Sequence, residues 1–213
     1  MTTFAIITEG VSDQPVIENI LEGMFPEPEI NILQPLRDAT DKQANQAGWE
    51  FVFEYLGSSK LGKAFQTNDY VVVQIDTDVS EAPNFNVPQE GPNGKLTPKE
   101  LVDQVALRLL SILESHHEAN HTLYRERMLF AIAVHSIECW LLPLYAKTEK
   151  KQGHLKNCHK LLERETQSKV HKNYRAYEEL SKPFRKGKKL MAASKCNPSL
   201  GIFVQALADA PIT

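Results

Sequence analysis

Residues 70–78, Tyr70-Val71-Val72-Val73-Gln74-Ile75-Asp76-Thr77-Asp78, decide the fold class of this chain. A continuous run of mainly β-branched apolar residues predicts a strand that is covered on both faces, as in a parallel sheet. The run leads directly into two aspartates. Because ligands of parallel α/β sheets bind at the carboxyl ends of the strands, this stretch predicts both a central strand and one side of a site.

The rest of the chain alternates short apolar runs with segments of helical periodicity, which predicts a parallel α/β sandwich with a basic helical extension. Gly57-Ser58-Ser59 is expected to interrupt one helix, and residues 80–98 are expected to form a long loop. The sequence divides into an α/β domain, residues 1–146, and an extension, residues 147–213, that packs on it. The expected strands are 4–8, 30–33, 70–75 and 127–134, and the expected helices are 16–24, 41–65, a helix from 97 onward, 137–144, 154–166, 170–182 and 199–208.

Charge is distributed unevenly along the chain. Residues 1–146 carry 9 Lys and Arg against 21 Asp and Glu, whereas residues 147–195 carry 15 against 5. This split fits an acidic, metal-binding site beside a surface for a polyanion. A solvated helical face explains the charge alone equally well.

The chain of 213 residues has no apolar run long enough for a membrane span and no signal-peptide pattern at its start. A soluble, cytoplasmic protein without a membrane partner is therefore expected. Cys139, Cys158 and Cys196 form an odd, scattered set without a CxxC pair, which argues against a disulfide framework and predicts reduced, packed thiols.

Three acidic residues are expected at one edge of the sheet. Glu9 follows the first strand, and Asp76 and Asp78 follow the strongest one. Converging carboxyl groups repel one another unless a cation lies between them, and oxygen ligands of this kind suit Mg²⁺ or Mn²⁺. The alternative is that the two aspartates are turn residues that accept backbone hydrogen bonds.

The motifs Ile6-Ile7-Thr8-Glu9-Gly10-Val11-Ser12-Asp13 and Asp76-x-Asp78, each after a strand, resemble the TOPRIM domain of topoisomerases, primases and OLD-type nucleases. Residues 137–142, Ile-Glu-Cys-Trp-Leu-Leu, and 197–200, Asn-Pro-Ser-Leu, are similar to segments of small stand-alone TOPRIM-like proteins. The resemblance implies a mainly parallel four-stranded sheet between helices. It also implies that Glu9 acts as acid or base and that Asp76 and Asp78 bind metal.

These residues predict a Mg²⁺-dependent nuclease or nucleic-acid-processing phosphotransferase, which the resemblance places in bacterial genome defence. Glu138 is a candidate for a further metal ligand or orienting carboxylate, with a buried structural role as the alternative. A non-catalytic nucleic-acid or protein-binding subunit is the main rival, working beside a separate ATPase because the chain has no phosphate-binding GxxxxGK[ST] loop. A small phosphohydrolase acting on nucleotides is a third alternative.

Several polar residues have more ordinary explanations. Asp13 is favoured as a helix cap over a ligand, and His117 and His121 as part of a polar helix end. A zinc site of His154, Cys158 and His159 is disfavoured because its ligand spacing is unpaired. Basic residues interleaved with an aromatic ring predict a nucleic-acid-binding segment. Its candidate contacts are Lys182, Arg185, Lys186, Lys188 and Lys189.

Overall fold

A computed structural model describes residues 1–146 and 156–211. Its core is a four-stranded sheet in the order β2-β1-β3-β6, in which every neighbouring pair is parallel. The parallel sheet that the sequence predicts is therefore confirmed. Its strands are β1 Thr3–Ile7, β2 Glu29–Gln34, β3 Tyr70–Asp76 and β6 Met128–Ala133.

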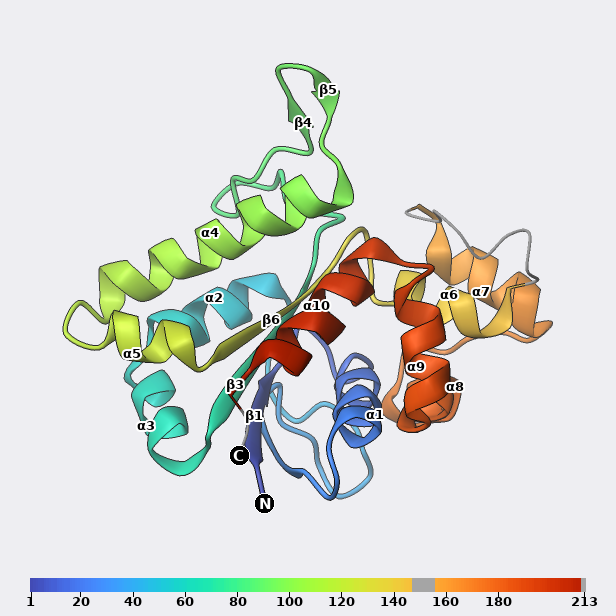
Figure 1. Ribbon diagram of the computed structural model, residues 1–213, viewed down its shortest axis with the longest axis horizontal. Coiled ribbons are helices and arrows are strands. Elements are labelled where there is room, and N and C mark those ends of the chain that lie inside the picture. Colours follow the sequence, from blue (N-terminus) through green and yellow to red (C-terminus); the bar gives the residue numbers. More distant parts are fainter. Residues whose placement is uncertain (147–155, 212–213) are drawn as a thin grey trace.

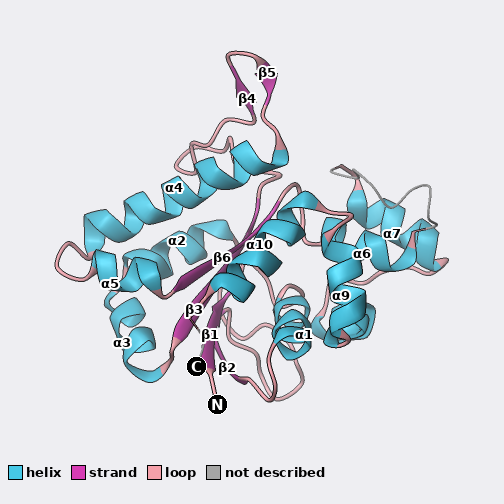
Figure 2. Ribbon diagram, in the orientation of Figure 1, coloured by secondary structure: helices cyan, strands magenta, loops and turns pink. Residues whose placement is uncertain are grey.

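Helices cover both faces of the sheet (Figures 1 and 2). Side chains alternate along the strands, so that Ile6 and Val72 join one hydrophobic cluster while Ile7 and Val73 join the other. One cluster is shared with α2 Trp49–Gly57, α3 Ser59–Thr67, α4 Pro98–His116 and α5 His121–Glu126. The other is shared with α1 Gln14–Met24, α6 Glu138–Tyr145 and the C-terminal helices.

The basic extension is part of the core on this second face. Its elements are α7 Cys158–Thr166, α8 Tyr174–Ser181, the 3-10 helix η2 Lys182–Arg185, α9 Gly187–Ser194 and α10 Pro198–Asp209. Side chains of all five elements are buried in the second cluster, together with Ile6 of β1 and Val72 of β3. The expected helix over 154–166 begins only at Cys158, and its residues 154 and 155 lie outside the described part of the chain.

Close contact between α1 and η2 depends on one glycine. A Cβ atom at Gly23 would lie 2.1 Å from the backbone oxygen of Phe184, well inside van der Waals contact. Only glycine lets the backbones approach this closely. The contact fixes η2 and the following helix α9 against α1.

Local signals predict α4 correctly but misplace the start of α2. The helix expected from residue 97 begins at Pro98, where Thr97 and Glu100 form a capping box. The helix expected from residue 41 begins instead at Trp49, because Gly48 has a φ of 116° and donates its N–H to the Glu9 backbone oxygen at 2.8 Å. The expected interruption is confirmed at Ser58, between α2 and α3.

The segment expected as a long loop contains a small hairpin. Its strands are β4 Glu90–Gly91 and β5 Gly94–Lys95, and the hairpin projects from the body of the molecule (Figure 1). Among the described residues, no helix combines the length and hydropathy needed to cross a bilayer.

Two of the three cysteines are joined, which corrects the expectation of reduced thiols for Cys139 and Cys158, whereas Cys196 is free as expected. Cys139 in α6 and Cys158 in α7 form a disulfide, with their Cα atoms 5.0 Å apart. Their separation of 19 residues carries no sequence signal, and only the packing of α6 against α7 brings them together. The bond also excludes Cys158 as a thiolate ligand of zinc, while His154 lies outside the described residues.

Candidate active site

Two of the predicted acidic residues meet at the carboxyl edge of the sheet. Glu9 follows β1 and Asp76 ends the neighbouring strand β3. The Asp76 backbone N–H donates to Glu9 Oε1 at 2.7 Å, so the Glu9 side chain lies across the end of β3. The parallel sheet thus places both carboxyl groups where ligands of this fold class bind.

Gln74 links these two acids, and the sequence analysis did not identify it. Its Oε1 atom accepts the Glu9 backbone N–H at 3.2 Å, and its Nε2 group donates to Asp76 Oδ1 at 2.9 Å. Gln74 is completely buried. A glutamine inside an otherwise apolar strand is the signal that could have revealed it, because a buried amide needs hydrogen-bond partners.

Burial raises the pKa values of both acids. For Glu9 the pKa rises from 4.5 to about 8, mainly because of burial and also because of the charges of Asp13 and Asp78, against a lowering hydrogen bond from Asp76. The pKa of Asp76 lies well above its ordinary value, again through burial and then the neighbouring acids. No ion pair joins Glu9 or Asp76 to a basic residue in the described ranges.

Asp13 belongs to the same acidic cluster. Although it occupies the N-cap position of α1, its side chain makes no capping hydrogen bond to that helix. Instead Asp13 Oδ2 accepts the Gly10 backbone N–H at 2.8 Å and closes the turn after Glu9. Burial, followed by the charge of Glu138, raises the Asp13 pKa to about 7. The expected helix cap is therefore correct for the position of Asp13 but wrong for its side chain, which bonds to Gly10.

Asp78 differs from Asp76 in its surroundings. It follows the end of β3, where its side chain is exposed. Its backbone N–H donates to the His135 oxygen at 3.0 Å, and Thr77 accepts the His135 N–H at 2.8 Å. His135 adopts a left-handed φ of 69°, and its Nδ1 atom is buried without a hydrogen-bond partner among the described residues. These bonds attach the Asp76-Thr77-Asp78 segment to the end of β6.

Glu138 lies beside this edge at the start of α6, with 1% of its surface exposed. Its Oε1 atom accepts the Tyr177 hydroxyl and lies 3.1 Å from Lys172 Nζ and 3.5 Å from His159 Nδ1. Burial raises the pKa of Glu138, but hydrogen bonds from Ser136 and Tyr177 and the charge of Lys172 outweigh it and hold the pKa at about 2. These contacts favour an orienting role for Glu138 over metal ligation.

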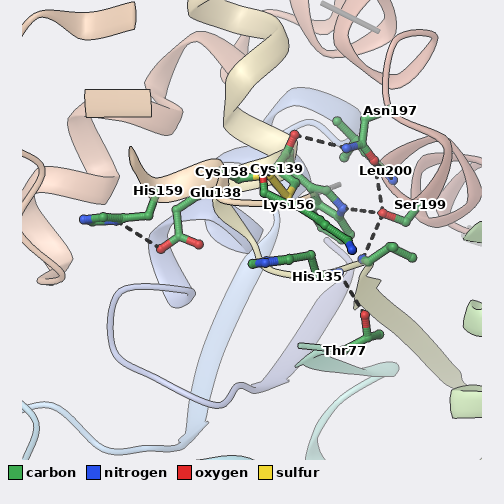
Figure 3. The surroundings of a disulfide bond; sticks show 12 residues. Thr77, His135, Glu138, Cys139, Lys156, Cys158, His159, Asn197, Ser199 and Leu200 are labelled. Atoms are coloured by element: carbon green, nitrogen blue, oxygen red, sulfur yellow. Dashed lines mark hydrogen bonds and ion pairs between the residues drawn. A yellow bond between two sulfur atoms is a disulfide. The ribbon is translucent and has the colours of Figure 1, made fainter. Parts of the chain in front are cut away.

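The start of α6 is fixed by the disulfide and by a polar clamp, which consists of Asn197 and Ser199 at the start of α10 (Figure 3). Ser199 Oγ accepts hydrogen bonds from the Val134 N–H at 3.2 Å and from Trp140 Nε1 at 2.9 Å. Asn197 Nδ2 donates to the Cys139 oxygen at 3.0 Å. The 197–200 segment named in the sequence analysis therefore positions the helix that carries Glu138.

The predicted nucleic-acid-binding segment is only partly available. Arg185 lies 2.7 Å from Glu22 and 3.2 Å from Glu178, and Lys182 lies 3.2 Å from Glu179. The other three predicted contacts are exposed and form no ion pair with a described residue; they are Lys186, Lys188 and Lys189.

The acidic edge suits a divalent cation by its chemistry. Mg²⁺ commonly takes one or two protein carboxylates and completes its shell with water and phosphate oxygens. Glu9 and Asp76 supply two partly buried, neighbouring carboxyl groups that form no ion pair with a described residue. In residues 1–146 and 156–211, no group of three or more His, Cys, Asp or Glu side chains is arranged to hold a metal ion. Because Mg²⁺ needs only one or two protein carboxylates, the pair Glu9 and Asp76 is still sufficient as its protein ligands.

The two histidines of the expected polar helix end interact with the backbone. His117 Nε2 lies 2.8 Å from the Leu56 oxygen, and His121 Nδ1 lies 2.8 Å from the Glu118 oxygen. Both rings therefore have local partners, as expected for a polar helix end.

Comparison with protein-family models, curated proteins and solved structures finds no match to this chain.

Proposed function

We propose that this protein is a TOPRIM-like nuclease that hydrolyses phosphodiester bonds with the help of Mg²⁺ or Mn²⁺. The observation that carries the proposal is the pair Glu9 and Asp76, held together at the carboxyl edge of a parallel sheet. Burial raises the pKa of each acid, and neither forms an ion pair with a described basic residue. Such a pair is costly for the fold and is typical of a functional site.

Glu9 and Asp76 would hold the metal ion, with Asp78 beside them to bind through water or to contribute on substrate binding. When bound, the ion supplies charge stabilisation to the phosphoryl oxygens. Gln74 fixes the orientation of Asp76 by donating to Oδ1. Two carboxyl groups are thereby presented to one substrate phosphate.

Glu9 is also suited to move a proton. Its carboxyl group lies across the end of β3, at the edge where the phosphate would bind, which places it to accept a proton from water. In the proposed reaction Glu9 accepts a proton from the attacking water. The water oxygen forms a bond to phosphorus, and the bond from phosphorus to the leaving ester oxygen breaks; the leaving oxygen keeps the electron pair and takes a proton from solvent.

The test compares cleavage of labelled single-stranded DNA, duplex DNA, RNA and dinucleotides in Mg²⁺, Mn²⁺ and EDTA. We expect metal-dependent cleavage by the wild-type protein, at least a hundredfold slower in Asp76→Asn. Glu114→Gln, an exposed change on α4, is the matched control and should cleave at the wild-type rate. Cleavage that is equal in Asp76→Asn and wild type, or absent from both, would contradict the proposal.

These substrates also separate the rival functions. Turnover of dinucleotides alone would identify a small phosphohydrolase. Binding of nucleic acid without turnover of any substrate would favour a non-catalytic subunit that works beside a partner such as an ATPase.

A further inference from the structure

One lysine of the basic extension reaches the acidic cluster. Lys172 lies between α7 and α8, and its Nζ atom is 3.1 Å from Glu138 Oε1. The Lys172 side chain is 61% exposed, whereas that of Glu138 is 1% exposed. A buried carboxylate therefore anchors an ammonium group whose side chain still faces solvent.

The charges around Lys172 come from more than this one ion pair. Partial burial lowers the pKa of Lys172, but the charge of Glu138 and then those of Asp76 and Asp13 outweigh burial and raise it. Lys172 in turn lowers the pKa of Asp13. Its ammonium group therefore acts on the same carboxyl cluster that contains the candidate metal ligand Asp76.

The contacts of Glu138 fix the position of its carboxylate and, through the ion pair, that of Lys172. Tyr177 donates its hydroxyl to the same Oε1 atom that pairs with Lys172, and His159 Nδ1 lies 3.5 Å from it. The carboxylate is further fixed because α6 and α7 are joined by the disulfide next to Glu138 and His159 (Figure 3). The second oxygen, Oε2, is buried without a hydrogen-bond partner among the described residues.

We propose that Lys172 binds a phosphate group of the nucleic-acid substrate beside Glu9 and Asp76, and that Glu138 is its positioning residue. This inference rests on the proposed function and adds the substrate contact to it. A phosphate that approaches several carboxyl groups is repelled by them, and a fixed cation at their edge offsets that repulsion. An ammonium group is a common phosphate contact, acting as a point charge.

The structure favours Lys172 over the segment predicted from sequence. Of that segment, Arg185 and Lys182 are already paired with acidic residues. Lys172 is also paired, but its partner is the buried Glu138 beside the acidic edge, and its charge lowers the pKa of Asp13 there. The lysines of α9 are left to contact more distant parts of a bound strand.

The experiment measures binding without metal, so that it does not depend on cleavage. Fluorescence anisotropy with a fluorescein-labelled single-stranded oligodeoxythymidylate in EDTA gives the Kd over a range of salt concentrations. The variants are Lys172→Ala, Lys172→Arg and, as a charge-matched control, Lys63→Ala on the exposed face of α3. A parallel series with an oligouridylate shows whether DNA or RNA supplies the phosphate.

We expect Lys172→Ala to weaken binding roughly tenfold at low salt, as for loss of one charged contact. The slope of log Kd against log salt should fall by about 0.7, the value for one phosphate of a single strand. Lys172→Arg should keep most of the affinity and the slope, and Lys63→Ala should match the wild type. Equal affinity and slope in Lys172→Ala and wild type would overturn the inference, as would the absence of any binding by the wild type.

Failure here is distinguishable from failure of the proposed function. Metal-dependent cleavage lost in Asp76→Asn, together with unchanged binding by Lys172→Ala, would leave the nuclease proposal standing and remove only the role of Lys172. Binding that depends on Lys172, without cleavage by any form of the protein, would support the phosphate contact of Lys172 and remove the nuclease proposal.

Discussion

Replacing Glu9 by Gln should stabilise the metal-free protein at neutral and alkaline pH. Glutamine retains an oxygen that can accept the Asp76 N–H but carries no charge into the buried edge. The folded-state pKa of Glu9 is about 8, against 4.5 for the ordinary carboxyl group. The size of the effect follows from this difference between the two states.

The sign and the pH window are set by the raised pKa. Below pH 4.5 Glu9 is protonated in both the folded and the unfolded chain, so its contribution to stability is fully present. As pH rises toward 8 the unfolded chain loses the proton while the folded chain keeps it, and the free energy of unfolding falls. Between about pH 5 and pH 8, Glu9 alone accounts for a loss of roughly 3–4 kcal/mol, equivalent to a Tm lower by about 10 °C.

The assay is urea unfolding in EDTA across this pH range. Wild-type stability should fall with pH, and Asp13 and Asp76 add to the slope because desolvation also raises their pKa values. Glu9→Gln should be flatter by the calculated amount, whereas Glu114→Gln should run parallel to the wild type. If wild-type stability is constant or rises from pH 5 to 8, or if Glu9→Gln runs parallel to it, the reasoning is refuted.

Metal ions should act in the opposite direction to this loss. A cation that binds only the folded protein stabilises it according to its concentration relative to Kd. Because protons compete for the same carboxyl groups, Mg²⁺ or Mn²⁺ should raise the wild-type Tm more at pH 8 than at pH 5. Thermal unfolding of wild type and Glu9→Gln with and without metal at both pH values measures this. A wild-type Tm increase that is equal at pH 5 and pH 8, or one that Glu9→Gln shows in full, would contradict it.

Three further substitutions test the packing around the site. Tyr177→Phe removes a hydrogen bond from the buried Glu138 carboxylate and should lower the free energy of unfolding by about 1–3 kcal/mol in a urea titration, with no change expected if that bond does not form. Gly23→Ala places a Cβ atom against the Phe184 oxygen and should cost roughly 1–3 kcal/mol despite the better helix propensity of alanine; a more stable variant would show that η2 does not approach α1 so closely. Cys139→Ala removes the disulfide and should lower stability by about 3 kcal/mol under oxidising conditions and far less in dithiothreitol, which urea unfolding with and without the reductant compares.

Local sequence signals were sufficient for the sheet and for part of the site. The β-branched run of β3 and the start of α4 near residue 97 depend on signals within a few residues, and both predictions are confirmed. The proximity of Glu9 and Asp76 follows from parallel strands, because their carboxyl ends meet at one edge. Their chemical role remains a prediction.

The remaining features depend on contacts between distant segments. Residues 41–48 look helical by pattern, yet the N–H of Gly48 bonds to Glu9 and the helix starts later. Lys172 reaches the site only because α7 and α8 pack beside α6 and α1 (Figure 1). The disulfide partners are likewise set by tertiary packing. Pattern and spacing carry no information on such pairings when a single sequence is read.

The clamp at Asn197 and Ser199 has a consequence for the order of synthesis. During translation the strands and their acidic edge emerge first, but Ser199 must still bond to Val134 and Trp140 before the start of α6 is fixed. Lys172 is also made late, well after the carboxyl groups that it faces. A nascent chain therefore carries the acids long before it carries Lys172 and the residues that fix the start of α6. The proposed hydrolysis would therefore begin only after the C-terminal helix has left the ribosome and fixed the start of α6.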